Sequence, residues 1–105
     1  ERPTELAELP KETRLRYLQE MSQLAEAVQR ATACHKLNYE CLGNVVHHLH
    51  FHVFPRQLTD PDPKAPVWGQ MPRGDEETKY KLDPARDREL KETIRRELNA
   101  VRAAG

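Results

Sequence analysis

The chain has 105 residues, and its 17 basic side chains (Lys and Arg) equal its 17 acidic ones, so the net charge is zero with neutral histidine. This length suits a single domain, and the balanced charge gives no electrostatic reason to expect a nucleic acid or an acidic membrane as partner. The apolar fraction of 37% is below the roughly 45–50% of an average globular domain, so we expect a thin core.

Membrane spans, a signal peptide and a disulfide framework would each indicate a compartment outside the cytoplasm. No apolar run has the length of a membrane span, and no signal peptide is visible. The two cysteines, Cys34 and Cys41, are too few for a disulfide framework. We therefore expect a reducing, cytoplasmic setting.

The first predicted element is a helix over residues 10–33. Pro10 suits the first helical position, and the acidic Glu12 follows in the first turn. Apolar residues then recur at helical spacing and form one stripe, most simply a packing face, made of Leu15, Leu18, Met21, Leu24, Ala25 and Val28.

A β-hairpin is predicted next. Residues 37–42 alternate apolar and polar side chains, and residues 45–54 form a run of β-favouring residues. Between them lie Gly43 and Asn44, which are typical turn residues. We therefore expect a hairpin with its bend at Gly43-Asn44.

An irregular segment and a second helix complete the chain. Five prolines interrupt regular structure here (Pro55, Pro61, Pro63, Pro66 and Pro72), and Val67-Trp68 is the one bulky apolar pair among them, so we expect this segment to wrap over the body. Asp83-Pro84 then predicts a helix start. Its narrow apolar stripe consists of Leu90, Ile94, Leu98 and Val101.

Three histidines alternate with apolar residues in the predicted second strand: His48, His50 and His52. Residues two apart on a strand share a face, with Cα atoms about 6.6 Å apart, so these imidazoles form a row. His47 belongs to the opposite face, and we interpret it as a packing or edge histidine.

Three interpretations of this row compete. Plain surface histidines are the least favoured, because exposed strand faces normally mix Thr, Lys and Glu. Zinc binding is the second, since two histidines two residues apart on a strand can hold zinc with a further ligand, for which Glu40 is the nearby candidate. The third is phosphoryl chemistry, in which a neutral imidazole attacks phosphorus and its neighbours neutralise phosphate oxygens.

The surrounding sequence favours the third interpretation. LNYECLGNVVHHLHFHVFPR (residues 37–56) resembles the histidine triad (HIT) family of nucleotide hydrolases and transferases, whose motif His-φ-His-φ-His-φ-φ (φ apolar) is matched completely by residues 48–54. TDPDPKAPVWG (residues 59–69) resembles the tail of a bacterial subgroup described as diadenosine tetraphosphate hydrolase-like. ERPTELAELPKE (residues 1–12) and the helix after it resemble the family's central helix. The resemblance covers residues 1 to about 70.

The resemblance implies a role for each histidine. His50 would attack the α-phosphorus with Nε2 and form a nucleotidyl-histidine, while its Nδ1–H donates to a partner, commonly a backbone carbonyl. His52 would contact the phosphate and assist the leaving group or the incoming water. His48 would support His50. No metal or other cofactor is implied, because imidazoles and amides meet the phosphate charge.

Two asparagines match further family positions. Asn38 corresponds best to an Asn or Gln that binds phosphate from the preceding strand. Asn44 matches a position often occupied by Gln, and it can equally serve only the turn. Where many relatives have a Ser or Thr donor, this chain has Val45.

The resemblance also implies a fold and an assembly. We expect an α+β fold, an antiparallel sheet with a central and a C-terminal helix, in a single domain of residues 1–105. Residues 1–73 would form the HIT core portion and residues 74–105 a helical extension. The family's strands before the central helix have no counterpart in these residues, so we expect a further N-terminal part or a partner chain to complete the core, in a homodimer.

The expected activity is hydrolysis or transfer of a nucleotidyl group. Dinucleoside polyphosphates, nucleoside phosphoramidates or adenylated compounds would be substrates. A phosphorylase or nucleotidyl transferase is the alternative enzyme. A non-catalytic nucleotide- or zinc-binding protein that keeps the motif is the alternative from another class.

Overall fold

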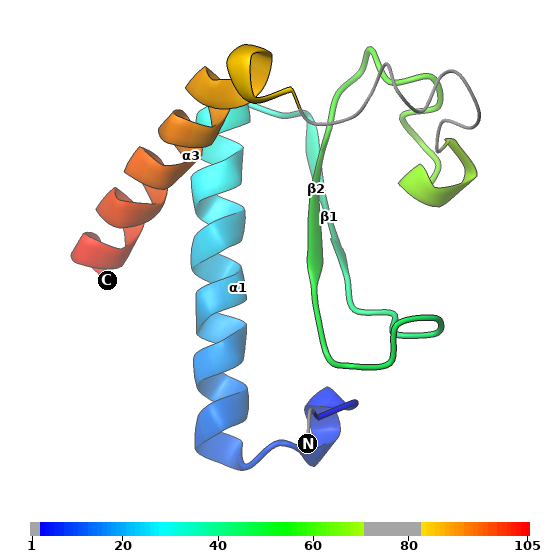
Figure 1. Ribbon diagram of the computed structural model, residues 1–105, viewed down its shortest axis with the longest axis vertical. Coiled ribbons are helices and arrows are strands. Elements are labelled where there is room, and N and C mark those ends of the chain that lie inside the picture. Colours follow the sequence, from blue (N-terminus) through cyan, green and yellow to red (C-terminus); the bar gives the residue numbers. More distant parts are fainter. Residues whose placement is uncertain (1–2, 71–82) are drawn as a thin grey trace.

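A computed structural model describes residues 3–70 and 83–105 of the chain (Figure 1). The elements in chain order are η1 (Leu6–Glu8), α1 (Lys11–Thr32), β1 (Lys36–Glu40), β2 (His52–Arg56), η2 (Val67–Gln70) and α3 (Pro84–Ala104). The predicted α+β class is confirmed, and so are both predicted helices. The predicted division of the domain at residues 73 and 74 lies outside the described residues.

Helix α1 has ordinary signals at both ends. Pro10 occupies the N-cap position, Glu12 lies in the first turn and Arg30 in the last, as the helix dipole favours. The helix ends at Ala33, which adopts a left-handed conformation (φ 49°) and donates its N–H to the carbonyl oxygen of Gln29. The chain can therefore turn directly into β1.

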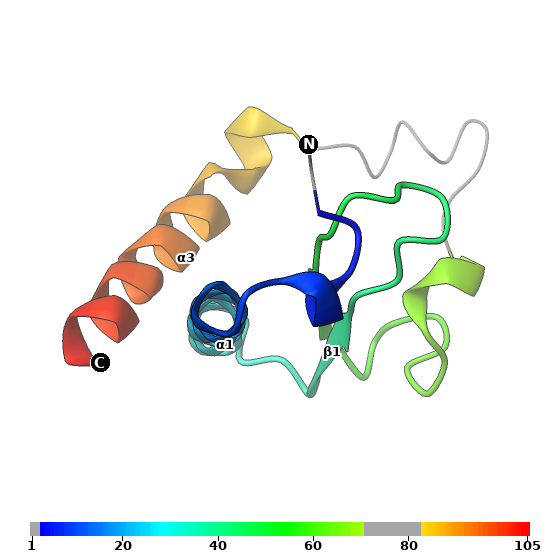
Figure 2. The ribbon, with the colours of Figure 1, turned by 90° about the horizontal axis from the view of Figure 1, so that it is seen from below.

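Helix α1 runs between α3 on one side and the hairpin on the other, as two perpendicular views show (Figures 1 and 2). Ala25 and Val28 of α1 form a small core with Leu37 of β1, and Val53 and Ile94 pack against it. Among the described residues the buried apolar side chains are Ala25, Ala27, Val28, Leu37 and Val101, and no large side chain is completely buried. The thin core expected from the composition is confirmed.

Strands β1 and β2 pair antiparallel, in a register that runs from Lys36 opposite Arg56 to Glu40 opposite His52. Leu37 and Val53 face α1 and contribute to the core. Because side chains alternate along a strand, the other face of the hairpin carries the polar and aromatic side chains of both strands. These are Lys36, Asn38, Glu40, His52, Phe54 and Arg56.

The predicted start of the second strand is wrong. Strand β2 begins at His52, not at Val45. Residues 41–51 form a long connection that bends at residues 44–46, so the bend near Gly43-Asn44 does not join the two paired strands directly. Val45 is 89% exposed, so its β-favouring side chain finds no surface to pack on. Leu49 bonds through its N–H to the carbonyl oxygen of Pro3 (2.8 Å) and not to β1.

Helix α3 begins where Asp83-Pro84 predicted it. The side chain of Asp83 accepts hydrogen bonds from the backbone N–H groups of Ala85 and Arg86, and Pro84 occupies the first turn. Neither α1 nor α3 is long and apolar enough to cross a membrane, and the same holds for the other helical segments of residues 3–70 and 83–105.

Candidate active site

The three histidines of the row keep their common side although only His52 belongs to a strand. Ring centroids lie 5.4 Å apart for His48 and His50, and 5.0 Å apart for His50 and His52. The intervening Phe51 points the other way, against Tyr17 of α1, with centroids 5.5 Å apart. The predicted row of imidazoles is thus present, with His50 and Phe51 on opposite sides of the segment.

His50 has a fixed tautomer. Its Nδ1 atom lies 2.8 Å from the carbonyl oxygen of His48. A carbonyl oxygen only accepts, so Nδ1 carries the hydrogen and donates it. In the neutral ring the lone pair is then on Nε2, which is the atom expected to act as nucleophile.

His52 has a different environment. Its ring stacks on Phe54, with centroids 5.3 Å apart and 15° between planes, and meets the edge of Trp68 at 5.3 Å. Its Nδ1 atom is buried without a hydrogen-bond partner in the described part of the chain. A ring protonated at Nδ1 would leave an N–H unpaired there, so this burial favours the tautomer with hydrogen on Nε2. His52 then offers an N–H donor on a ring whose centroid lies 5.0 Å from that of His50.

Asn38 lies on the same face of the hairpin as His52, but its oxygen has a partner within the protein. Oδ1 accepts a hydrogen bond from Nη1 of Arg56 at 2.9 Å. The Nδ2 amide group is the part of Asn38 that can donate to a phosphate oxygen.

Arg56 is a residue whose importance the sequence did not reveal. It is buried (4% exposed) and also donates to a carboxylate oxygen of Asp60 at 2.8 Å and to the carbonyl oxygens of Asp62 and Ala65. The hydrogen bond from Arg56 lowers the pKa of Asp60 below its ordinary value. Arg56 therefore ties residues 57–66 to the hairpin, and its position after the motif was the only available signal.

Trp68 is a second such residue. Its indole N–H donates to the carboxylate of Glu40, and its ring meets His52 and Phe54 edge-on. As the bulky residue of a proline-rich segment it was expected to cover the body, and it packs on the hairpin at the His52 end of the histidine row. Glu40, considered above as a metal ligand, is instead the acceptor for this indole.

Asn44 and His47 lie in the connection of residues 41–51, and both are exposed. No hydrogen bond joins Asn44 to the histidine row within the described residues. The Nδ1 atom of His47 lies 3.1 Å from the carbonyl oxygen of Gly43, so its contact is local. The interpretation of His47 as a packing or edge histidine is wrong, because His47 is exposed and belongs to neither strand.

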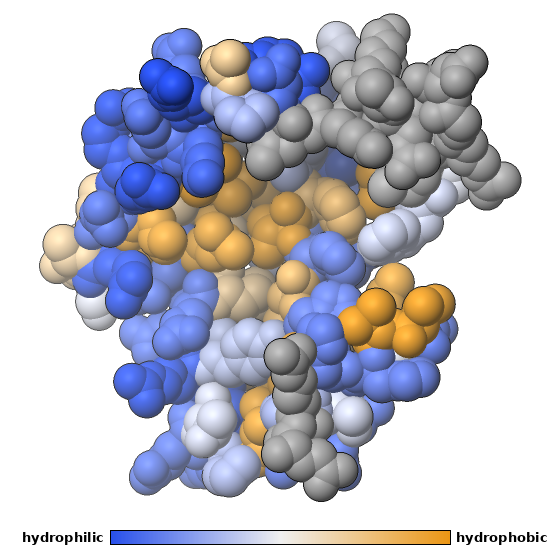
Figure 3. All heavy atoms as spheres, in the orientation of Figure 1, coloured by the Kyte–Doolittle hydropathy of each residue, from blue (hydrophilic) through white to orange (hydrophobic). Residues whose placement is uncertain are grey.

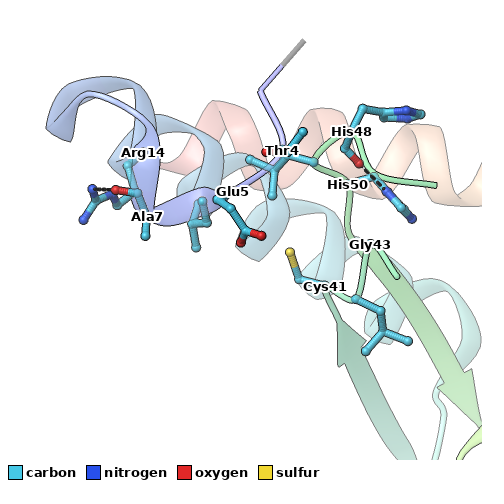
Figure 4. A pocket seen from close by; sticks show the side chains of 11 residues that line it. Thr4, Glu5, Ala7, Arg14, Cys41, Gly43, His48 and His50 are labelled. Carbon is cyan, nitrogen blue, oxygen red and sulfur yellow. Dashed lines mark hydrogen bonds between the residues drawn. The ribbon is translucent and has the colours of Figure 1, made fainter. Parts of the chain in front are cut away.

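A cavity of about 440 Å³ lies beside the row, between η1 and the connection of residues 41–51 (Figure 4). Thr4, Glu5, Arg14 and Cys41 contribute side chains to it, and the segment around His48 and His50 forms one wall. In Figure 4 the two imidazole rings point away from Thr4, Glu5 and Cys41. The two rings therefore project to the other side of their segment from these three side chains.

A metal centre has no geometric support in the described part of the chain. Within residues 3–70 and 83–105, no three side chains of His, Cys, Asp or Glu come together in a way that could hold a metal ion. The zinc interpretation of the row thus lacks a ligand set there, since a zinc site needs three or four such groups.

Comparisons with protein-family models and with solved structures identify the same family. The family model described as "HIT domain" matches residues 1–59. Crystal structures of histidine triad proteins from Sinorhizobium meliloti 1021 (27% identity) and Bradyrhizobium japonicum (28%) each match with a TM-score of 0.78 over 90% of this chain and 66% of theirs. One from Marinobacter aquaeolei VT8 matches with 30% identity and a TM-score of 0.78 over 94% of this chain and 68% of its own.

The matched structures are longer than this chain. The chain spans about two thirds of the length of the solved structures. A share of 90% or more of this chain reaches past residue 73, so these structures also match part of the C-terminal segment. Among curated proteins, no sequence match was found. The match of the family model to more than half of the chain, together with the histidine row, shows that the chain belongs to the histidine triad (HIT) family.

Proposed function

We propose that the protein is a nucleotide hydrolase or nucleotidyl transferase that works through a nucleotidyl-His50 intermediate. The observation that carries the proposal is the hydrogen bond from His50 Nδ1 to the carbonyl oxygen of His48. It holds the ring in one orientation and leaves the lone pair on Nε2. Family membership supports nucleotide binding, and the three aligned imidazoles support chemistry at phosphorus.

The reaction has two steps. Nε2 of His50 attacks the α-phosphorus, a P–N bond forms, and the bond from phosphorus to the leaving group breaks with its electron pair on the leaving oxygen. Water or another acceptor then attacks the same phosphorus, the P–N bond breaks, and its electron pair returns to Nε2. The proton of the attacking water passes to solvent.

His52 supports both steps as a hydrogen-bond donor. With hydrogen on Nε2, it stabilises the charge that develops on phosphate or leaving-group oxygens without having to lose its proton. This role suits leaving groups that depart as phosphate anions, as in dinucleoside polyphosphates, better than amines. Diadenosine tetraphosphate is therefore the first substrate to test, ahead of nucleoside phosphoramidates.

The remaining roles are part of the same proposal. His48 supports His50 through its carbonyl group, and Asn38 binds phosphate through its amide N–H groups. The protein acts as a homodimer without a metal or other cofactor, in the cytoplasm. Its two cysteines, one half-buried and one exposed, are free, which suits a reducing compartment.

The test is a search for the covalent intermediate. The purified protein is mixed with diadenosine tetraphosphate, stopped in the millisecond range in base, where phosphoramidate bonds persist, and analysed by mass spectrometry of its peptides. The expected result is an adenylyl adduct on the peptide that carries His50, formed equally in the presence of a chelator. Turnover that disappears with the chelator would favour the zinc alternative, and binding without turnover would favour a non-catalytic nucleotide-binding protein.

A further inference from the structure

The ring of His52 is enclosed on one side by a residue that lies outside the histidine motif. Trp68 belongs to η2, sixteen positions further along the chain, and its ring lies edge-on to both His52 (5.3 Å) and Phe54 (5.7 Å). Trp68 is 42% exposed. Burial of the indole therefore contributes little to its position against His52. A further interaction is needed to fix this position.

The carboxylate of Glu40 supplies the missing attachment. Glu40 stands directly opposite His52 in the register of the hairpin, so its side chain projects from the same face. It accepts the hydrogen bond from the indole N–H of Trp68. A charged acceptor makes this bond stronger than a neutral one would be. The orientation of the indole is thus fixed at one end by Glu40 and at the other by contact with two rings.

The segment that carries Trp68 is tied to the same hairpin. Arg56, the last residue of β2, holds Asp60 through its side chain and Asp62 and Ala65 through their carbonyl oxygens. The chain is therefore fastened to the sheet only a few residues before Trp68. The hydrogen bonds of Arg56 therefore place the indole on the same face of the hairpin as His52.

His52 itself lacks the constraint that His50 has. A hydrogen bond to a backbone carbonyl fixes the ring of His50, whereas Nδ1 of His52 has no partner in the described part of the chain. The orientation of the His52 ring depends on the rings around it: Phe54 against one face, and the edge contacts with Trp68 and His50. Removing Trp68 from its place would free the ring to turn about its side-chain bonds.

We propose that Trp68, held by Glu40, is a positioning residue for His52 and keeps its Nε2–H directed at the phosphate or leaving group. The inference rests on the proposed function, in which His52 donates to those oxygens. Trp68 and Glu40 do not touch the reacting atoms. Their contribution is to the orientation of a donor that acts in the transition state, so they affect kcat more than KM.

The experiment uses a matched pair of substitutions at Glu40. Glu40→Gln keeps an oxygen that accepts from the indole, whereas Glu40→Ala removes it. We expect Glu40→Ala to lower kcat about tenfold or more, with KM changed less than about twofold, because a displacement near 1 Å can cost up to about a hundredfold. Glu40→Gln is expected to retain most of the activity. Trp68→Phe, which loses the N–H but keeps a ring, should resemble Glu40→Ala.

A spectroscopic readout separates this role from general loss of structure. The carbon-bound ring protons of His52, assigned with a His52→Asn variant, feel the ring current of Trp68. Their NMR shifts should move in Glu40→Ala and stay in place in Glu40→Gln, which also lacks the charge. Leu58→Ala is the control on the same segment, since Leu58 is 68% exposed, and it should change neither the spectrum nor the kinetics.

The outcomes that overturn the inference are distinct from failure of the proposed function. Unchanged His52 signals in Glu40→Ala would show that the Glu40–Trp68 bond does not hold the ring. Moved signals with unchanged kcat would show that the ring position does not affect the reaction. Equal losses in Glu40→Gln and Glu40→Ala would assign the effect to charge. A wild-type protein without turnover would refute the proposed function and the kinetic part, while the spectra would still decide whether Trp68 holds His52.

Discussion

The Nδ1 atom of His50 lies 2.8 Å from the carbonyl oxygen of His48, only two residues earlier in the chain. The segment that carries the proposed nucleophile thus also supplies the acceptor that fixes its tautomer. No distant element has to be placed accurately for this bond to form, because the two residues are only two positions apart. The bond uses only the backbone of residue 48, so it accounts for the orientation of the His50 ring and not for the imidazole of His48.

Replacement of His50 by Ala or Asn should abolish turnover, with a loss of at least about a thousandfold, because the variant has no nucleophile for the first step. Nucleotide binding should largely survive, since the other phosphate contacts remain. Steady-state kinetics and equilibrium binding measure the two effects.

The matched control for this substitution is His47→Ala. His47 is exposed, and its ring bonds only to the carbonyl oxygen of Gly43 in its own loop. Its removal should leave kcat within about twofold, as expected of a surface change away from the reacting atoms. Near-normal turnover in the His50 variant would rule out the covalent mechanism.

The helices could be predicted from the sequence because their signals are local. Pro10, Asp83 and the two apolar stripes act within a few residues. The structure places both ends of α1 within one residue of the prediction, and α3 starts at the predicted Asp83-Pro84. The row of imidazoles was equally predictable, since alternation in an extended segment needs no partner.

The start of β2 and the surroundings of His52 could not be predicted, because they depend on distant partners. Val45 and Val46 favour strands, but they are exposed in the long connection. Arg56 takes two of its partners from backbone carbonyls, and any residue type supplies such groups. The indole of Trp68 finds an acceptor 28 positions away in the sequence, at Glu40.

The protein is expected to form a homodimer. Its core is thin, and large apolar side chains remain exposed on α1 and the hairpin, among them Leu15 (56%) and Tyr39 (52%). Figure 3 shows apolar surface running across α3, α1 and the hairpin on one face of the molecule. Burial of such surface stabilises an interface by about 25 cal/mol per Å². Light scattering at micromolar concentration should report twice the chain mass.

A substitution can locate this interface. Tyr39→Glu places a charge at an exposed position of β1 and should shift the mass toward one chain if this strand lies in the interface. Lys36→Glu, at an exposed position on the other face of β1, serves as the control. A wild-type protein that scatters as a single chain at the same concentration would contradict the dimer.

Helix α3 should depend on its N-cap. Asp83 accepts hydrogen bonds from the N–H groups of Ala85 (3.0 Å) and Arg86 (3.3 Å). Asp83→Ala removes both and should lower the free energy of unfolding by about 0.5–2 kcal/mol, whereas Asp83→Ser should retain most of it. Urea unfolding followed by circular dichroism measures the difference. Equal stability of the Ala and Ser variants would show that the cap contributes nothing.

The last prediction concerns pH and the attachment of residues 57–66. The hydrogen bond from Arg56 lowers the pKa of Asp60, so the folded state prefers the charged carboxylate more than the unfolded chain does. The stabilisation is complete above the ordinary value, near 3.8, and is lost as the pH falls through the lowered value. Asp60→Asn lacks this titration but keeps an oxygen that can accept from Arg56.

Wild type should therefore exceed Asp60→Asn in stability at pH 6, by at most about 1 kcal/mol for a partly exposed pair, and the difference should shrink toward pH 3. Trp68 is the single tryptophan of the chain, so its fluorescence follows the attached segment directly. Thermal unfolding is recorded for both proteins at pH 6 and pH 3, by fluorescence and by circular dichroism. A stability difference that is the same at both pH values would show that the charge on Asp60 does not hold this segment to Arg56.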